Sequence, residues 1–210
     1  MPDVPAPPTP TPDSRTLIDA AGRLRGRWAL HVVQALLAGP AGFNDLRRAV
    51  PGAGPSVLTR RLADLEAAGI VSREVIPRTP PASRYALTPS GTALGPAIER
   101  MVAWAAQWRI GDPHHDVAGA LAIFQERWML ELHCALLAGP RRFGELARTI
   151  GVNEATLSQR LGDLERRGLI HRLTDQPGSP YAFTPAGRGF EPVGTALLEW
   201  AAAASTPPTP

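Results

Sequence analysis

The sequence predicts a mainly α fold of the α+β type, built as two tandem domains that each consist of helices followed by a two-stranded hairpin. Blocks of sequence recur at offsets of 96–100 residues, which indicates a duplicated unit. Leucines recur at helical spacing in both copies. Each copy also contains two short segments of strand composition. The predicted domains span residues 15–110 and 111–204, between proline-rich tails at 1–14 and 205–210 that we expect to be disordered.

The repeat is clearest at five identical residues, LLAGP, which occupy positions 36–40 and 136–140. Trp28 and Trp128 precede these blocks by the same distance. The segment YAL-TP at 85–89 matches YAF-TP at 181–185, now at a smaller offset. The two small length changes fall where loops are expected, so the pattern indicates a tandem duplication.

The helices of the first copy follow from its stop and start signals. A short helix is expected before Trp28, and a second one over about 28–38, which ends at a Gly-Pro pair. A third helix over about 43–50 is followed by the turn sequence PGAG at 51–54. A fourth helix over about 55–68 begins with proline and closes with glycine.

The rest of the first copy has strand character before a final helix. Residues 70–76 and 84–88 have strand composition and are joined by the proline-rich loop 77–81. A last helix is predicted over about 89–109. Helix, helix, turn, helix and then a hairpin is the order of a winged helix-turn-helix domain, and the second copy repeats it.

Composition and charge narrow the classes of protein. All 22 basic residues are arginine, which a GC-rich coding bias explains, and the net charge is +3. Residues 15–110 hold 13 arginines against 6 acids, whereas residues 111–210 hold 9 against 11. A basic half and a mildly acidic half indicate different tasks for the two copies.

Several classes of protein lack their signatures in this sequence. There is no secretion signal and no apolar run long enough to span a bilayer, so we expect a cytoplasmic protein without membrane contact. Cys134 is the single cysteine, which excludes an intrachain disulfide and a cysteine-rich zinc site. No nucleophile, phosphate-loop or metal-hydrolase motif is present. We therefore expect no enzyme activity, no cofactor and no metal.

At this point the sequence resembles the HxlR-type transcriptional regulators. The resemblance covers nearly all of residues 15–110, and the second copy matches more loosely. The motifs that carry it are GRW at 26–28, LLAGP-x-x-F-x-x-L at 36–46, PG at 51–52, VLTRRLADLEAAGIVSREV at 57–75, P-x-x-P-x-x-x-x-Y-x-LT-x-x-G at 77–91 and Trp104 in the first copy, and RW at 127–128, LLAGPRRFGELARTIGV at 136–152, TLSQRLGDLERRGLI at 156–170 and YAFTPAG at 181–187 in the second.

The resemblance implies a small regulator that dimerises through its terminal helices and binds double-stranded DNA at an inverted repeat. This chain departs from the family by carrying two domains rather than one. Many members have a sensing cysteine about 13 residues before the tryptophan, where this chain has Arg15 and His115. A basic residue that the family has before the third-helix phenylalanine is present as Arg142 but is Gly42 in the first copy.

The fourth helix of the first copy is the predicted recognition helix. Leu58, Leu62 and Leu65 form its core stripe, and the opposite face near its start would reach the major groove. We expect base contacts there, because arginine that reads guanine is the commonest specific contact. Arg61 flanks the core and is expected to touch a phosphate or a carboxylate. The predicted DNA-binding residues of the first copy are Ser56, Thr59, Arg60 and Arg61 on the helix, and Arg73, Arg78 and Arg84 on the wing.

The second copy is less basic at the corresponding places. Asn153 is a good N-cap. Glu154, at the N-terminus of the helix, interacts favourably with the helix dipole but repels phosphate. Asp175 and Gln176 stand at the tip of its wing. The predicted DNA-binding residues of this copy are Arg141, Arg142, Ser158, Gln159 and Arg160.

Two other groups of residues have a structural and a functional interpretation. The five tryptophans are explained by core and dimer packing, with a ligand pocket as the alternative. Residues 112–116, Asp-Pro-His-His-Asp, have metal-ligand types but fit a solvated linker better, since adjacent side chains seldom converge on one ion.

The function expected from the sequence is duplex-DNA binding by two repeats packed as an internal pseudo-dimer. Pairing between two chains, as a homodimer, is the alternative assembly. The alternative function is DNA binding by the first domain only, with the second domain serving in dimerisation or in sensing a ligand. No residue pattern identifies a small-molecule effector.

Overall fold

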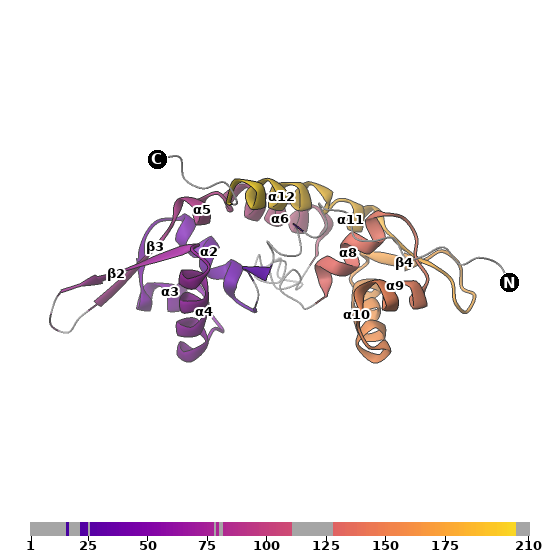
Figure 1. Cartoon of the computed structure of the whole chain (residues 1–210), viewed down its shortest axis with the longest axis horizontal. Helices are drawn as coiled ribbons and strands as arrows, with labels where there is room; N and C mark the ends of the chain where they lie inside the picture. Colours follow the sequence, from indigo (N-terminus) through magenta and orange to yellow (C-terminus); the bar gives the residue numbers. More distant parts are fainter. Residues whose placement is uncertain are drawn as a thin grey trace.

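A computed structural model describes Thr16 and residues 22–24, 26–77, 79, 82–110 and 128–204. The predicted fold class is confirmed, because each repeat forms helices and one small antiparallel sheet (Figure 1). The two tails, the linker residues 112–116 and nearly all of the helices expected before the two tryptophans lie outside the described residues. In the described part of the chain, no helix has both the length and the apolarity to cross a membrane.

Three helices form the core of the first repeat, and their bounds agree with the predicted ones to within a residue or two. Leu46, Leu58, Leu62 and Leu65 are at most 2% exposed and face one another between these helices. The two helices of the helix-turn-helix therefore pack through a leucine core, and their opposite faces are exposed to solvent. The helices are α2 (Ala29–Leu37), α3 (Phe43–Ala49) and α4 (Pro55–Ala67).

A tryptophan supports the turn between α3 and α4. Trp28 adopts a left-handed backbone conformation, with φ of 82°. This conformation is strained for a bulky residue and is held by its surroundings. Its ring lies against Gly52, where an added Cβ would come within 3.0 Å of the indole. Because Gly52 also has a positive φ, only glycine fits both the turn and this contact.

The wing of the first repeat is a three-stranded sheet of order β1-β3-β2, made by β1 (Ala41–Gly42), β2 (Val71–Ile76) and β3 (Ala82–Leu87). The long strands pair antiparallel from Val71–Leu87 to Ile76–Ala82. The short strand β1 was not predicted, because two residues carry no readable alternation.

The prediction of one continuous terminal helix over 89–109 is wrong, since two helices occupy this range. They are α5 (Pro89–Thr92) and α6 (Gly95–Trp108). Pro96 has no amide hydrogen to donate to the carbonyl of Thr92, so a continuous helix would lose a bond and clash there. The same break recurs in the second repeat, where Pro192 holds the equivalent position.

The second repeat follows the same order with a shorter wing. Its strands pair over only three residues each, from Ile170–Phe183 to Arg172–Tyr181. Its elements are α8 (Met129–Leu137), α9 (Phe143–Ile150), α10 (Glu154–Arg166), β4 (Ile170–Arg172), β5 (Tyr181–Phe183), α11 (Pro185–Arg188) and α12 (Glu191–Ala204).

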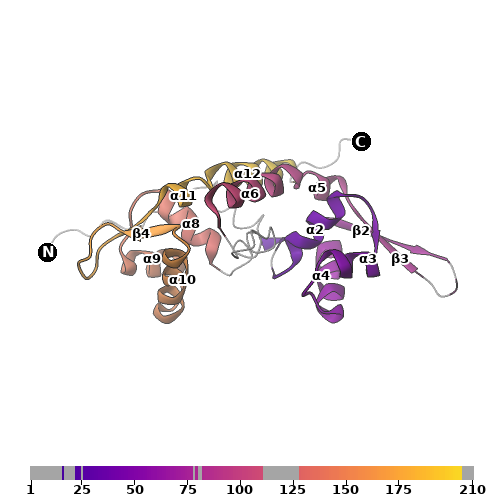
Figure 2. The ribbon, with the colours of Figure 1, turned by 180° about the vertical axis from the view of Figure 1, so that it is seen from behind.

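The two repeats meet where α6 and α12 pack against each other (Figures 1 and 2). Trp104 Nε1 donates to the Ala186 carbonyl at 2.8 Å, and Trp200 Nε1 donates to the Ser90 carbonyl, also at 2.8 Å. Both residues of one bond are offset by 96 from those of the other, so the contacts are reciprocal. Trp104 and Trp200 are buried, in agreement with the packing interpretation of these two tryptophans.

Candidate nucleic-acid interface

The helix α4 places three predicted residues on one solvent-facing surface. Its leucine stripe is buried, whereas Ser56, Thr59 and Arg60 are all exposed. No acidic side chain lies in its first turn, which leaves the positive end of the helix dipole uncompensated. The Thr59 hydroxyl donates to the Pro55 carbonyl at 2.9 Å, so its oxygen remains able to accept a hydrogen bond.

An open groove joins this helix to the wing. Its volume is about 900 Å³. The structure thereby brings together three residues that the sequence predicted separately, Thr59, Arg73 and Arg84. Asn44 and Asp45 on α3 also line the groove and were not predicted. Their sequence pattern does not distinguish them from other exposed polar residues, because only the packing of α3 beside α4 and the wing places them in the groove.

The two wing arginines are free of carboxylates. Arg73 Nε donates to the Ser83 hydroxyl at 3.0 Å. Arg84 lies opposite Glu74 in the strand register, but the described residues give neither arginine an ion pair. Both guanidinium groups can therefore contact an anion in the groove. Arg78, the third predicted wing residue, lies outside the described residues.

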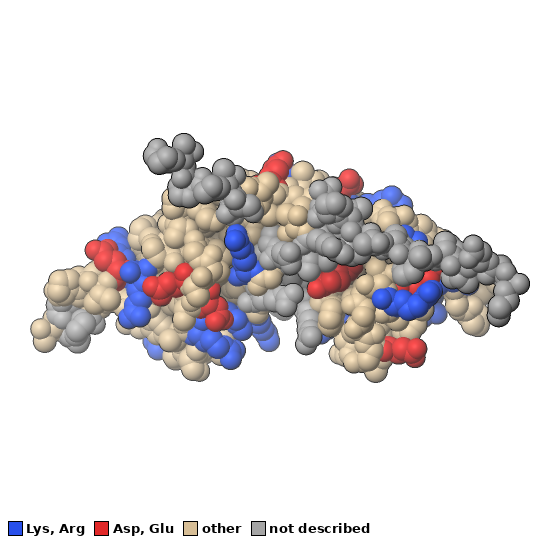
Figure 3. Space-filling view, viewed as in Figure 1, with Lys and Arg blue, Asp and Glu red and all other residues tan. Residues whose placement is uncertain are grey.

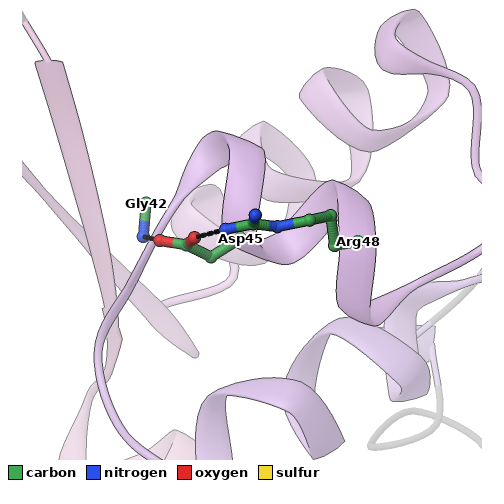
Figure 4. A network of polar contacts seen from close by, with 3 residues as sticks. All are labelled: Gly42, Asp45 and Arg48. Atoms are coloured by element: carbon green, nitrogen blue, oxygen red, sulfur yellow. Dashed lines mark hydrogen bonds and ion pairs between the residues drawn. The ribbon is translucent and has the colours of Figure 1, made fainter.

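Asp45 would be an obstacle to an anion in this groove, yet its charge is offset within α3 (Figure 4). Its carboxylate accepts from the Gly42 amide at 3.3 Å and from Arg48 at 2.5 Å. The Arg48 hydrogen bond, followed by that of the Gly42 amide, lowers the pKa of the Asp45 carboxyl below its usual value. The pair fixes the start of the helix and leaves little net charge.

Arg61 is turned inward. Its Nε donates to the Arg27 carbonyl at 3.1 Å, and its Nη1 forms an ion pair with Asp64 at 2.7 Å. Only 15% of the side chain is exposed. The carboxylate contact expected from its place beside the core is therefore present, and the arginine connects the segment before α2 to α4.

The second repeat presents a different surface on α10. Asn153 accepts from the Thr156 amide at 2.8 Å, as expected for an N-cap. Ser158 and Gln159 are exposed, and so is Glu154 in the first turn. This helix therefore offers neutral hydrogen-bonding groups and a negative charge where α4 offers an arginine.

Arginines of the second repeat are engaged inside that repeat. Arg142 Nη1 donates to the Gly178 carbonyl at 3.1 Å, which ties the start of α9 to the wing loop. Arg160 lies 3.7 Å from Asp163. Arg172, the counterpart of Arg73, lies 3.5 Å from Glu165 and stacks over the Tyr181 ring. Arg141 joins the sheet through main-chain bonds to Tyr181.

The surface charge reflects this difference. In Figure 3, arginines gather around α4 and the base of the first wing, with acidic groups among them. On the second repeat the same view shows fewer arginines, and an acidic group stands out near α10. The two repeats thus differ in the charge that they present around α4 and α10.

Helices, a turn, a further helix with an exposed polar face and a hairpin wing define a winged helix-turn-helix protein, here in tandem. The profile of the HxlR-like helix-turn-helix family matches residues 23–112 and again residues 123–208. The chain belongs to this family, and the predicted resemblance and duplication are confirmed.

Known relatives match one repeat at a time. The HTH-type transcriptional regulator YvaP of Bacillus subtilis is 40% identical over 85 residues, which are 40% of this chain and 79% of that protein. The HTH-type transcriptional regulator YodB of the same organism is 38% identical over 82 residues, covering 39% and 73%. Among solved structures, the redox regulator HypR in its reduced form has 33% identity and a TM-score of 0.43, covering 44% of this chain and 92% of that one.

Proposed function

We propose that this protein is a sequence-specific, duplex-DNA-binding transcription regulator of the cytoplasm, with domains at about 15–110 and 111–204 that act as an internal pseudo-dimer. One observation carries the proposal. The helices α4 and α10 lie on the same side of the layer formed by α6 and α12, at opposite ends of the molecule (Figures 1 and 2). Two recognition helices on one side can face successive major grooves of one duplex.

The first repeat supports strong binding. Its helix exposes Ser56, Thr59 and Arg60, of which the arginine can read a guanine in the major groove. The groove beside it holds Arg73 and Arg84 without acidic partners and fits the backbone of a DNA strand. Base contacts by the helix would then set the sequence, and phosphate contacts by the wing would fix the position.

The second repeat supports a weaker contribution of another kind. Ser158 and Gln159 can hydrogen-bond to bases, but Glu154 repels phosphate and Arg142 and Arg172 are engaged internally. We therefore propose an asymmetric operator with two unlike half-sites about one DNA turn apart. Only the first half-site would receive wing contacts.

A second candidate is DNA binding by the first repeat alone, with the second repeat serving in assembly or sensing. The internal contacts of Arg142 and Arg172 are the observation that favours it. The two candidates differ in the role of α10. Replacing Ser158 and Gln159 by alanine weakens operator binding if α10 reads bases, and leaves it unchanged if the first repeat binds alone.

Genome-wide recovery of bound DNA fragments tests the proposal. We expect an enriched motif with two different half-sites whose centres lie about 10 base pairs apart. A motif with a single half-site would support the second candidate. The absence of any enriched motif, together with no shift of the recovered fragments in a gel, would show that DNA binding is the wrong function.

A further inference from the structure

An apolar cavity lies in the second repeat, next to its contact with the first. Its walls come from α8, α10, β5, α11 and the residues beside these elements, and one wall comes from α6 of the other repeat. That wall is Trp104, whose indole meets the Phe190 ring edge-on at 5.5 Å. The lining residues are Trp104, Met129, Leu132, His133, Leu136, Leu164, Leu169, Phe183, Gly187 and Phe190.

His133 is the polar member of this lining. The residue is 7% exposed, and its ring contacts that of Phe183, at 4.9 Å between centroids, and that of Phe190, at 4.7 Å. Its Nε2 atom is buried and has no hydrogen-bond partner among the described residues. A buried polar atom without a partner destabilises a fold, and native structures leave few of them.

The first repeat shows that the fold does not need this histidine. The residue equivalent to His133 is Val33, which is fully buried. The two phenylalanines correspond to Leu87 and Leu94. The second repeat therefore has an imidazole and two aromatic rings where the first has three aliphatic residues, all around one cavity. Packing alone explains the aromatic rings, but it does not explain an unpartnered nitrogen.

We infer that this cavity is a binding site for a small, neutral, aromatic molecule with one hydroxyl group, which pairs with His133 Nε2. The ring contacts follow from the aromatic walls, since offset and edge-to-face contacts between rings are favourable. Neutrality follows from the apolar lining, because an unpaired charge there would be costly. Burial lowers the pKa of His133 to about 4, so its imidazole is itself neutral near pH 7.

The size of the cavity connects the ligand to the junction between the repeats. The cavity measures about 20 Å³, which is room for about one water molecule. A larger ligand must displace a wall, and Trp104 also donates to Ala186 across the junction. Ligand entry would thus alter the contact that sets how α4 and α10 are placed. This inference does not depend on DNA binding.

The test compares two probes of nearly equal size, phenol and toluene. The five tryptophans give five indole N–H signals in a nitrogen-15 correlation spectrum, and Trp104→Phe identifies that of Trp104. We expect phenol to shift the Trp104 signal in a saturable way and to bind about five- to tenfold more tightly than toluene, as one neutral hydrogen bond implies. The signal of Trp28, which lies against Gly52, serves as the internal reference and should not move.

His133→Val, which copies Val33 of the first repeat, is the matched variant. It should fold with equal or greater stability and should bind phenol no more tightly than toluene. Three results would overturn the inference: no saturable shift with either probe, equal affinity for the two probes in the wild type, or an unchanged preference for phenol in the variant. The first result would mean that the cavity holds no more than a water molecule.

Discussion

At the scale of residues, neighbours in the chain have opposite fates. Arg60 and Arg61 are adjacent, yet Arg60 points into solvent whereas Arg61 bonds to Arg27 and Asp64. A rotation of 100° per residue explains the difference, because it carries the second arginine to the edge of the leucine stripe. The functional weight of the two side chains should differ accordingly.

Arg60→Ala should weaken binding to the recovered operator by about 1–3 kcal/mol and relax the preference at one base pair, because a bidentate contact to guanine is lost. A mobility-shift titration against the operator and its single-base variants measures both effects. Arg61→Ala is the control, and it should lower thermal stability without relaxing any base preference. Unchanged operator affinity in Arg60→Ala would show that another face of α4 enters the groove.

His133 should make folding stability depend on pH. Burial lowers its pKa from 6.5 to about 4 in the folded protein, so the unfolded chain binds the proton first as the pH falls. The free energy of unfolding is therefore unaffected by this histidine above about pH 6.5 and decreases as the pH falls toward 4, by about 2–3 kcal/mol in total.

Urea unfolding of the wild type and His133→Val between pH 7.5 and 4.5 checks this dependence. Carboxylates titrate in both proteins, so the difference between the two curves isolates the histidine. The wild type should lose stability relative to the variant as the pH falls through this range. Parallel curves would contradict the assignment of the effect to His133.

At the scale of elements, the sequence predicts those helices and strands whose apolar pattern is sustained over several residues or whose ends are marked by glycine or proline. The helices α2, α3 and α4 lie where leucine spacing and Gly-Pro signals put them, and the two hairpins lie on the segments of strand composition. The break before α6 was missed although Pro96 marks it, because the apolar pattern continues through it. Strand β1 was missed because it is held only by its partner β3.

The candidate site was predictable only as a set of exposed side chains. Periodicity gives the face of α4, but it does not show that Arg73 and Arg84 share a groove with Thr59. Equally, nothing in the local sequence indicates that Arg142 reaches Gly178, since 36 residues separate them. Contacts between distant segments decide which arginines remain available.

The wing of the first repeat should contribute backbone contacts. Arg84→Ala or Arg73→Ala should reduce affinity for all sequences alike and lower the slope of log affinity against log salt by about one unit, because one phosphate contact releases about one counterion. Arg172→Ala in the second wing is the matched control and should leave the slope unchanged, since Glu165 already pairs with it. A sequence-selective loss with an unaltered slope would show that these residues read bases instead.

The short helices α5 and α11 should be sensitive to a single methyl group. An added Cβ at Gly91 would lie 2.1 Å from the Ile70 carbonyl oxygen, and one at Gly187 equally close to that of Leu169. Gly91→Ala and Gly187→Ala should each destabilise the protein by about 1–3 kcal/mol or more, because backbone must move.

Gly162→Ala, which copies Ala63 of the first repeat, should instead stabilise α10 by about 0.5–1 kcal/mol. Thermal unfolding of the three variants decides; equal stability of Gly91→Ala and wild type would contradict the close approach.

At the scale of the whole molecule, the duplication lets one chain supply both sides of a contact that the family resemblance assigns to two chains. Trp104 and Trp200 each donate across the junction to the repeat that does not contain them. Arg100 adds a third bond, from its Nη1 to the Pro192 carbonyl at 3.1 Å. Because both partners are on one chain, their effective concentration is high, and pairing within the chain should win over pairing between chains.

The assembly prediction follows from this junction. We expect a solution mass near 22.4 kDa by light scattering at micromolar concentration, which is the mass of one chain. Trp104→Phe and Trp200→Phe each remove one indole N–H while keeping an aromatic ring, so each should lower thermal stability by about 1 kcal/mol. If the junction sets the placement of α4 and α10, the double variant should also tolerate a changed spacing between half-sites better than the wild type does. A stable mass near twice that of one chain would show instead that the terminal helices pair between chains, and that the internal junction does not exhaust their binding surface.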